Sequence, residues 1–231
     1  MISIVIPTRE EERSIEKTIR QFESLSIPHE VIVSDGKSAD RTVGIARATG
    51  ARVVVNESGV RSPSKQRNDG AHVAEGEFIL FIDATVIMPD IQMYLTKALK
   101  HFEDPKVVAL AVPQWIYPES ATRTDRIMLT ITNWMLKVQK MGSGKFVLTR
   151  RSAFEKLGGY REDLMTREDG DFFIRSKTIG TVVFDTDLPI YYAGRREHAW
   201  GWPKLLYVWV RDTISVILFD KSASEDWAPV R

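Results

Sequence analysis

The sequence predicts an α/β fold in which a doubly wound, mostly parallel sheet carries helices on both faces. Two short apolar runs, residues 31–34 and 78–82, indicate strands that are buried on both sides. Each run ends in an aspartate, Asp35 or Asp83. Segments with helical spacing of apolar residues separate the runs, which is typical of parallel sheets. Because ligands of such sheets bind beyond the carboxyl ends of the strands, the two aspartates predict a nucleotide-diphosphate site.

The first half of the chain is expected to alternate strand and helix. Apolar residues at helical spacing predict a helix over residues 14–25 and another that begins after Asp90. Ser38 and Asp40 supply capping groups for a helix that runs to Ala48 and ends before Gly50. A further helix is expected over residues 66–74. The expected strands are residues 2–6, 31–34, 51–55, 78–82 and 107–112.

The alternation becomes less regular after Pro113. The pattern there predicts helices over residues 123–139, 151–157 and 169–179 and a last helix from about residue 203, with strands over 146–149 and 181–185. No repeat, low-complexity segment or linker interrupts the chain. We therefore expect a single domain, residues 1–231, with two functional halves, residues 1–112 and 113–231.

Composition and charge argue against several classes of protein. Charged side chains make up 27% of the 231 residues and sum to a net charge of +1, whereas nucleic-acid-binding proteins usually carry a basic excess. A hydrophobic content of 43% supplies a core without metal or disulfide, and the absence of cysteine excludes a zinc–thiolate site. No basic leader or cleavage site precedes the first strand, so we expect a cytoplasmic protein. The apolar segment 205–219 is interrupted by Arg211 and Asp212 and is too short to predict a membrane span.

Four segments occur together in an order that is found in a known family. They are residues 4–11 (IVIPTREE), 33–42 (VSDGKSADRT), 76–85 (GEFILFIDAT), and a last region with LTRRSAFEKLGGY at 148–160 and REDGDFFIR at 167–175. With these segments the chain resembles the inverting family 2 glycosyltransferases of the GT-A fold, over nearly its whole length. The resemblance implies that residues 1–112 are the nucleotide-sugar-binding half and residues 113–231 the acceptor half.

The resemblance implies donor contacts at the ends of the early strands and near the C-terminus. Asp35 matches a base-contacting position, although a turn aspartate before Gly36 is the alternative explanation. Lys65 lies where the family has a basic residue that meets phosphate or base, and a solvated basic face is its alternative. An ordinary strand-to-helix turn is the alternative for residues 7–10. The implied donor-binding residues are Pro7, Thr8, Glu10, Asp35, Lys65, Asp83, Arg195 and Arg196.

The sequence departs from the family at its metal motif. That motif is acid–any–acid, but here it reads Asp83-Ala84-Thr85, and the hydroxyl of Thr85 is a weak substitute for a carboxylate. His198 offers a replacement ligand because imidazole binds divalent ions, whereas an ordinary surface or core histidine is the alternative. The resemblance implies a divalent cation, Mg or Mn, and we expect Asp83, Thr85 and His198 to hold it together with the donor's phosphates, weakly when the donor is absent. The alternative is that Arg195 and Arg196 neutralise the diphosphate and no metal is needed.

Glu168 and Asp169 match the acidic pair of the family. The resemblance implies that Asp169 is the general base that takes the proton of the acceptor hydroxyl, with Glu168 as the second candidate. Asp171 and Arg175 continue the match, but an i,i+4 ion pair along the helix explains them without a functional role.

The last predicted helix, which ends at Phe219, is mostly apolar and aromatic. A buried helix or a homodimer interface explains it. The alternative is an interfacial helix that brings a lipid-linked acceptor to the site at a membrane surface. Apolar residues of the predicted helix 123–139 extend this surface: Met128, Leu129, Ile131, Trp134 and Met135.

The predicted function is inverting transfer of a sugar from a nucleoside-diphosphate sugar to an acceptor hydroxyl or lipid phosphate. Stabilisation of the departing diphosphate is expected to be the largest catalytic contribution. The expected partners are the nucleotide-sugar donor and a sugar or lipid-linked acceptor, with no nucleic acid. A non-catalytic nucleotide-sugar-binding or scaffold protein is the second hypothesis, and Thr85 supports it. A nucleotidyltransferase would need a glycine-rich basic loop after the first strand, which residues 7–12 lack.

Overall fold

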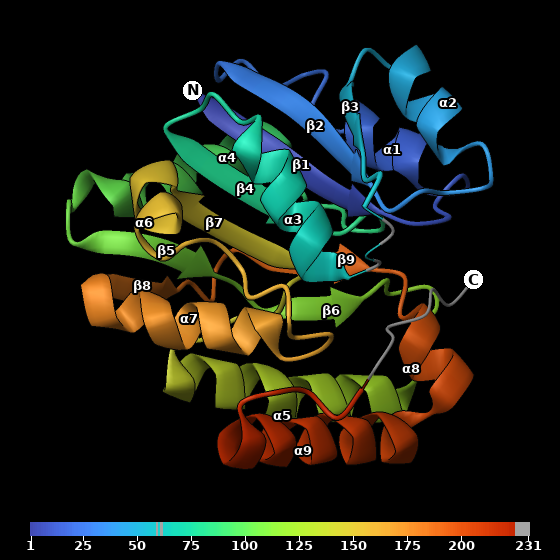
Figure 1. Cartoon of the computed structure of the whole chain (residues 1–231), viewed down its shortest axis with the longest axis vertical. Helices are drawn as coiled ribbons and strands as arrows, with labels where there is room; N and C mark the ends of the chain where they lie inside the picture. The colour runs from blue at the N-terminus through green and yellow to red at the C-terminus, as the bar shows by residue number, and fades with distance from the viewer. Residues whose placement is uncertain (59, 61, 225–231) are drawn as a thin grey trace.

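A seven-stranded sheet forms the centre of the computed structural model, which describes residues 1–58, 60 and 62–224 (Figure 1). Its strand order is β3-β2-β1-β4-β7-β5-β8, and every neighbouring pair except those of β7 is parallel. The predicted α/β fold with a mostly parallel sheet is confirmed. The predicted end of the domain at residue 231 lies outside the described residues. The strands are β1 Ile2–Thr8, β2 His29–Asp35, β3 Arg52–Val55, β4 Phe78–Ile82, β5 Val107–Ala111, β7 Phe146–Arg150 and β8 Thr181–Phe184.

Strand β7 runs antiparallel to both of its neighbours. Its first residue, Phe146, therefore pairs with Ile82, the last residue of β4. The segment before β7 reaches the carboxyl end of β4, where the backbone N–H of Asp83 donates to the carbonyl of Lys145 at 3.2 Å. Strand β7 belongs to the second half of the sequence but lies between two strands of the first half, so both halves share one sheet.

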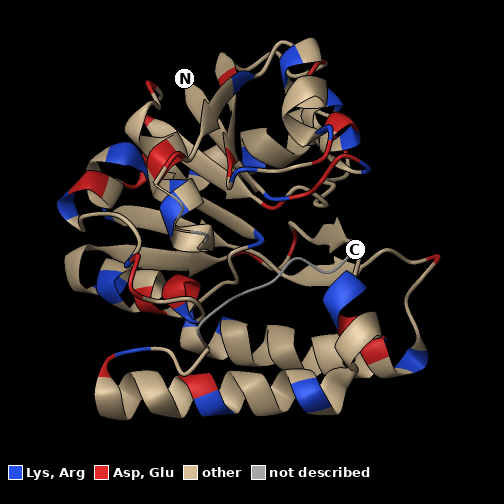
Figure 2. Cartoon of the chain, turned by 45° about the vertical axis from the view of Figure 1, so that its right-hand side comes forward, with Lys and Arg blue, Asp and Glu red and all other residues tan. Residues whose placement is uncertain are grey.

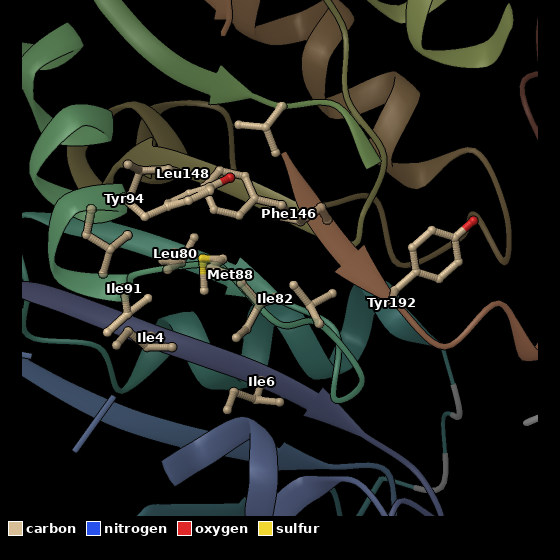
Figure 3. Close-up of a cluster of buried hydrophobic side chains, with 14 of the residues drawn as sticks. Ile4, Ile6, Leu80, Ile82, Met88, Ile91, Tyr94, Phe146, Leu148 and Tyr192 are labelled. Carbon is tan, nitrogen blue, oxygen red and sulfur yellow. The ribbon is translucent and has the colours of Figure 1, made fainter. Parts of the chain in front are cut away.

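Helices cover both faces of the sheet, as predicted. Side chains alternate along each strand, so Ile4 and Ile6 enter one buried cluster and Val5 enters the other. Figure 3 shows part of the first cluster, in which Tyr94 of α4 lies beside Phe146 of β7, with ring centroids 5.8 Å apart. The helices on that face are α1 Ile15–Arg20, α2 Thr42–Ala48 and α4 Ile91–Lys100, which the 3₁₀ helix η1 His101–Glu103 follows. Those on the other face are α3 Pro63–His72, α6 Arg151–Lys156 and α7 Glu168–Ile179.

A two-stranded parallel sheet and three further helices complete the described chain. They are β6 Gln114–Ile116, β9 Ile190–Tyr192, α5 Arg123–Gln139, α8 Arg195–Trp200 and α9 Trp202–Phe219. Helices α5 and α9 run side by side at one end of the molecule (Figures 1 and 2). Asp125 of α5 accepts a hydrogen bond from the indole N–H of Trp202 at 2.7 Å, which joins the starts of the two helices. Within the described residues, no helix has the length and hydropathy of a membrane span.

The predicted helix over residues 14–25 is wrong in its second half. Helix α1 ends at Arg20, and turns follow in which Phe22 donates to the carbonyl of Ile19 at 3.1 Å and Leu25 donates to that of Phe22 at 3.0 Å. Apolar residues spaced by three positions suit these tight turns as well as an α-helix, so Phe22 and Leu25 are still buried.

Helix α3 begins three residues earlier than the expected residue 66. Ser62 caps it, because its hydroxyl accepts from the backbone N–H of Lys65 at 3.1 Å, and Pro63 takes the first helical position. The short elements β6, β9 and α8 were not predicted, since three to six residues are too few to display a period.

Candidate functional site

A cavity of about 670 Å³ opens where β1 and β4 end. Eight of the residues predicted from the sequence line it: Pro7, Thr8, Asp83, Thr85, Glu168, Asp169, Arg195 and Arg196. They come from β1, the end of β4, the start of α7 and α8, so the fold brings distant parts of the chain together. The other four predicted residues, all within the described chain, lie outside the lining: Glu10, Asp35, Lys65 and His198.

A buried arginine of α3 joins the acidic residues of the cavity. Arg67 is 3% exposed. Its Nη1 donates to Glu168 Oε1 at 2.8 Å, and its Nη2 donates to the carbonyl of Gly144 at 3.1 Å and lies 3.3 Å from Asp83 Oδ1. Burial alone would lower the pKa of Arg67, but the charges of Glu168 and Asp83 raise that pKa above its ordinary value. Arg67 therefore remains a cation that links the end of β4 to the start of α7.

The approach of Arg67 depends on a glycine before β7. A Cβ atom on Gly144 would lie only 2.3 Å from Arg67 Nη2, so a larger residue there would displace the guanidinium. The backbone N–H of the same Gly144 donates to Asp169 Oδ2 at 2.8 Å. One backbone position thus contacts both the central cation and the candidate base.

The acid pair occupies the first turn of α7, where the helix dipole favours negative charge. The side chain of Glu168 is only 10% exposed. Its burial, followed by the negative charge of Asp169, raises the pKa of Glu168 to about 7, although Arg67 opposes the shift. Asp169 accepts from Gly144 and, through Oδ1, from the N–H of Gly170 at 2.7 Å. These two bonds fix the orientation of the Asp169 carboxylate at the cavity wall.

Asp35 is fully buried and organises the loop that follows β2. Its Oδ2 accepts from the N–H of Ser38 at 2.7 Å, and its Oδ1 accepts from the hydroxyls of Ser38 at 2.6 Å and Thr8 at 3.1 Å. Glu10 supports the same loop, because its Oε1 accepts from the N–H of Ala39 at 2.8 Å. The structure gives Asp35 the turn role named above as the alternative, and contact with a base stays a prediction.

Lys65 and His198 have protein partners away from the cavity lining. Lys65 pairs with Asp69, and its Nζ lies 3.9 Å from Glu162 Oε1. His198 Nε2 lies 3.1 Å from Oδ2 of Asp125. Their predicted roles as donor and metal contacts stay predictions.

Two arginines at the start of α8 bring positive charge to the cavity. Arg195 Nη2 donates to Glu11 Oε1 at 2.6 Å, and the Arg196 guanidinium lies 4.7 Å from the centroid of the Trp200 ring. Farther along α7, Arg175 Nε donates to Asp171 Oδ2 at 2.6 Å, which confirms the ion pair expected there.

Asp83 is the carboxylate that the sequence predicts as a metal ligand. Its side chain is 39% exposed and lies in the cavity lining with Thr85. The described residues contain no group of three or more His, Cys, Asp or Glu side chains that could hold a metal. Since one or two carboxylates with substrate phosphates commonly bind Mg²⁺, these residues fit a divalent ion only when a donor supplies further oxygens.

Sequence reasoning missed Arg67 and Gly144. Arg67 stands two residues after Lys65. Side chains two positions apart on an α-helix point about 200° away from each other, so the orientation of α3 decides which of these two residues faces the site. Gly142 and Gly144 stand close together just before β7, and that glycine-rich segment was the available indication of a close backbone approach.

Comparisons with known proteins concern the family and the fold of the chain. The family described as Glycosyl transferase family 2 matches residues 3–158. The chain is 36% identical, over 91 residues, to a poly(ribitol-phosphate) beta-glucosyltransferase of Bacillus spizizenii, a match that covers 36% of this chain and 14% of that protein.

Two solved structures share the fold. A mannosyltransferase from Pyrobaculum calidifontis in complex with GDP-Man and Mn²⁺ has a TM-score of 0.69 at 21% identity, over 86% of this chain and 59% of that one. Glucosyl-3-phosphoglycerate synthase from Mycobacterium tuberculosis, in complex with Mn²⁺, UDP and glucosyl-3-phosphoglycerate, has a TM-score of 0.64 at 21% identity, over 94% of this chain and 78% of that one. These likenesses confirm the predicted GT-A fold. The chain spans a small part of the Bacillus relative and somewhat more than half of the mannosyltransferase.

Proposed function

The chain belongs to glycosyl transferase family 2, and we propose that it transfers a sugar from a nucleoside-diphosphate sugar to an acceptor hydroxyl or lipid phosphate, with inversion at the anomeric carbon. One observation carries the proposal. A carboxylate at the end of β4, an acid pair at the start of α7 and two arginines of α8 converge on one cavity. That set offers a proton acceptor and a positively charged place for a leaving diphosphate.

The diphosphate of the donor would lie between Asp83 and the arginines of α8. Guanidinium groups bind phosphate oxygens through strong, charge-assisted hydrogen bonds, and both Arg195 and Arg196 line the cavity. Pro7 and Thr8 line it at the end of β1. Our further candidates for donor contact are Asp35, Glu10 and Lys65. Each would contact the bound nucleotide while it keeps its hydrogen bonds or ion pairs within the protein.

A Mg²⁺ or Mn²⁺ ion would be held by Asp83, with Thr85 beside it, and by phosphate oxygens of the donor. When bound, such an ion would neutralise charge on the diphosphate. His198 would have to leave Asp125, 3.1 Å away, in order to serve as a further ligand.

Asp169 is the proposed general base. It would take the proton of the acceptor hydroxyl as that oxygen forms a bond to the anomeric carbon, while the bond from this carbon to the diphosphate oxygen breaks. For a lipid phosphate, which carries no such proton at neutral pH, Asp169 would instead orient the acceptor. Arg195 and Arg196 would stabilise the charge that develops on the departing diphosphate.

A non-catalytic nucleotide-sugar-binding protein is the second candidate, and one observation favours it. Thr85 replaces a carboxylate in the metal motif, and no described cluster of metal-binding side chains compensates for that loss. This protein would bind the same donors and leave them intact.

A panel of UDP-, GDP- and dTDP-sugars in a thermal-shift assay would identify the donor, and release of sugar from it would then be measured with and without Mn²⁺. Asp169→Asn should lower turnover by roughly 10²–10⁴-fold, the usual contribution of a general base, and should leave donor binding nearly intact. Asp171→Asn is the matched control, since Asp171 pairs with Arg175 on the same helix. Donor binding without any sugar release by the wild type would support the binding protein, and binding of no nucleotide-sugar would overturn both candidates.

A further inference from the structure

Helix α5 exposes a stripe of large apolar side chains. Ile127, Ile131, Trp134 and Val138 follow one another at spacings of four, three and four residues and are 47–64% exposed. That spacing places them on one face of the helix. Leu129 of the same helix is buried in the core, so the stripe points away from the protein.

Helix α9 carries a second stripe of this kind. Tyr207, Val210, Ile214 and Ile217 follow at spacings of three, four and three residues and are 50–75% exposed. Leu205 of α9 is buried in the same core cluster as Leu129. We call the two stripes together the α5–α9 face. Large contiguous apolar patches are rare on the surface of soluble monomeric proteins, and where they occur they indicate an interaction site.

The α5–α9 face is continuous with the candidate functional site. Met135 of α5 and Leu206, Val210 and Ile214 of α9 are exposed, and all four also line the cavity that contains Asp169. The apolar end of the cavity therefore opens on this face.

The charges of the two helices are divided by sign. Their acidic side chains, Asp125 and Asp212, are buried, whereas their exposed charged side chains are all basic. These exposed basic residues are Arg123, Arg126, Lys137 and Lys204. Apolar stripes flanked by basic side chains are complementary to an anionic lipid surface, which attracts Lys and Arg and receives apolar groups between its headgroups.

We propose that the α5–α9 face binds the surface of an anionic membrane, with both helices lying in the interfacial plane. A second copy of the chain fits less well, because a two-fold interface would bring together two surfaces that both carry basic charge. If the proposed glycosyl transfer is correct, on which this consequence rests, the cavity opens toward the lipid. A lipid-linked acceptor would then reach Asp169 without leaving the membrane.

Helix α9 is also fixed to the loop that precedes the acid pair. Buried Asp212 accepts from the hydroxyls of Thr166, at 2.5 Å, and Ser224, at 2.6 Å. Thr166 lies two residues before Glu168 and lines the cavity. These bonds hold the α5–α9 face and the acid pair in one geometry.

The test is sedimentation of the full chain with vesicles of phosphatidylcholine, with or without phosphatidylglycerol. We expect binding to the anionic vesicles that salt weakens. The double substitution Trp134→Ser with Ile217→Ser should reduce binding at least tenfold, since it removes two of the most exposed apolar groups from the face. Met93→Ser with Ile174→Ser is the matched control, because both are exposed apolar residues of other helices.

Substitution of exposed basic residues by alanine tests the electrostatic part. The substitutions are Arg126→Ala, Lys137→Ala and Lys204→Ala, and each should weaken binding to the anionic vesicles about fivefold. An equal number of exposed lysines elsewhere serves as the control, in the set Lys97→Ala, Lys100→Ala and Lys156→Ala. All these side chains lie on the surface, so circular dichroism should show an unchanged fold.

The proposal is overturned if the wild type does not bind anionic vesicles, or if the variants of the α5–α9 face bind these vesicles as strongly as the control variants do. It is also overturned if light scattering shows that the wild type is a dimer that does not bind vesicles, and that the Trp134→Ser, Ile217→Ser variant is a monomer. Nucleotide binding is measured in parallel to separate the two proposals. Vesicle binding without affinity for any nucleotide-sugar would refute the glycosyl transfer alone, and the reverse result would refute the membrane surface alone.

Discussion

The raised pKa of Glu168 predicts that this residue makes the protein less stable as the pH rises. The carboxyl lies beside Asp169 in a site where burial disfavours its charged form, so its pKa rises from 4.5 to about 7 on folding. Between these values the folded protein holds a proton that the unfolded chain has released. Stability therefore falls as the pH increases through that window. At about 1.4 kcal/mol per pKa unit, the shift amounts to roughly 3 kcal/mol of unfolding free energy.

Glu168→Gln removes this titration and keeps the shape of the side chain. The free energy of unfolding is measured with urea from pH 4.5 to 8 for the wild type and the variant. We expect the wild type to lose roughly 3 kcal/mol relative to the variant across this range, because the other titrating groups largely cancel in the comparison. Glu155→Gln is the control for the loss of a carboxyl group, since Glu155 is well exposed on α6. A flat difference for Glu168→Gln, or one of opposite sign, would refute the reasoning.

Three further changes test the site. Thr85→Asp should restore a second carboxylate beside Asp83 and raise the affinity for Mn²⁺ in calorimetry without nucleotide, whereas the neutral Thr85→Asn should not; equal affinities would show that the geometry of the motif has been lost. Asp35→Ala should weaken nucleotide binding by roughly 1–3 kcal/mol through an unpaired polar group, and an unchanged affinity in a folded variant would place the base elsewhere. Asp212→Ala should lower kcat while leaving the KM for the donor nearly unchanged, because it frees the loop of Thr166; Asp212→Asn should recover most of kcat, and a variant with normal kcat would deny Asp212 a positioning role.

The sequence was sufficient to predict the central sheet because its strands are apolar on both faces. Residues 78–82 are a run of apolar side chains, and four of the five are completely buried. Such a run permits few other structures. The antiparallel direction of β7 could not be predicted, because an apolar strand of five residues carries no mark of its direction. Its place between β4 and β5 is decided by packing that involves the whole chain.

The candidate site was partly predictable for a similar reason. Asp83, which follows a buried strand, and Asp169, which lies in the first turn of a helix, both reach the cavity, whereas Asp35, which also ends a buried strand, binds the loop after β2. Lys65 was predicted from the place of a basic residue in the family, and His198 from the affinity of imidazole for divalent ions, but the orientations of α3 and α8 give them Asp69 and Asp125 as partners. Side-chain direction on a helix depends on which face is buried, and the polar helix α3 shows little periodicity from which to read it.

The position of Arg67 suggests how the site tolerates Thr85. A carboxylate at position 85 would add a third acid to Asp83 and Glu168, which already share the one guanidinium. Because position 85 is a threonine, less negative charge in the cavity repels an incoming diphosphate. The arginines of α8 can then neutralise the diphosphate with less help from a bound cation. On this argument, loss of the acid weakens the metal site and at the same time lowers the electrostatic cost of binding the donor without metal. Activity of the wild type should therefore depend less on Mn²⁺ than activity of Thr85→Asp does, and the opposite order in a titration of Mn²⁺ would contradict the compensation.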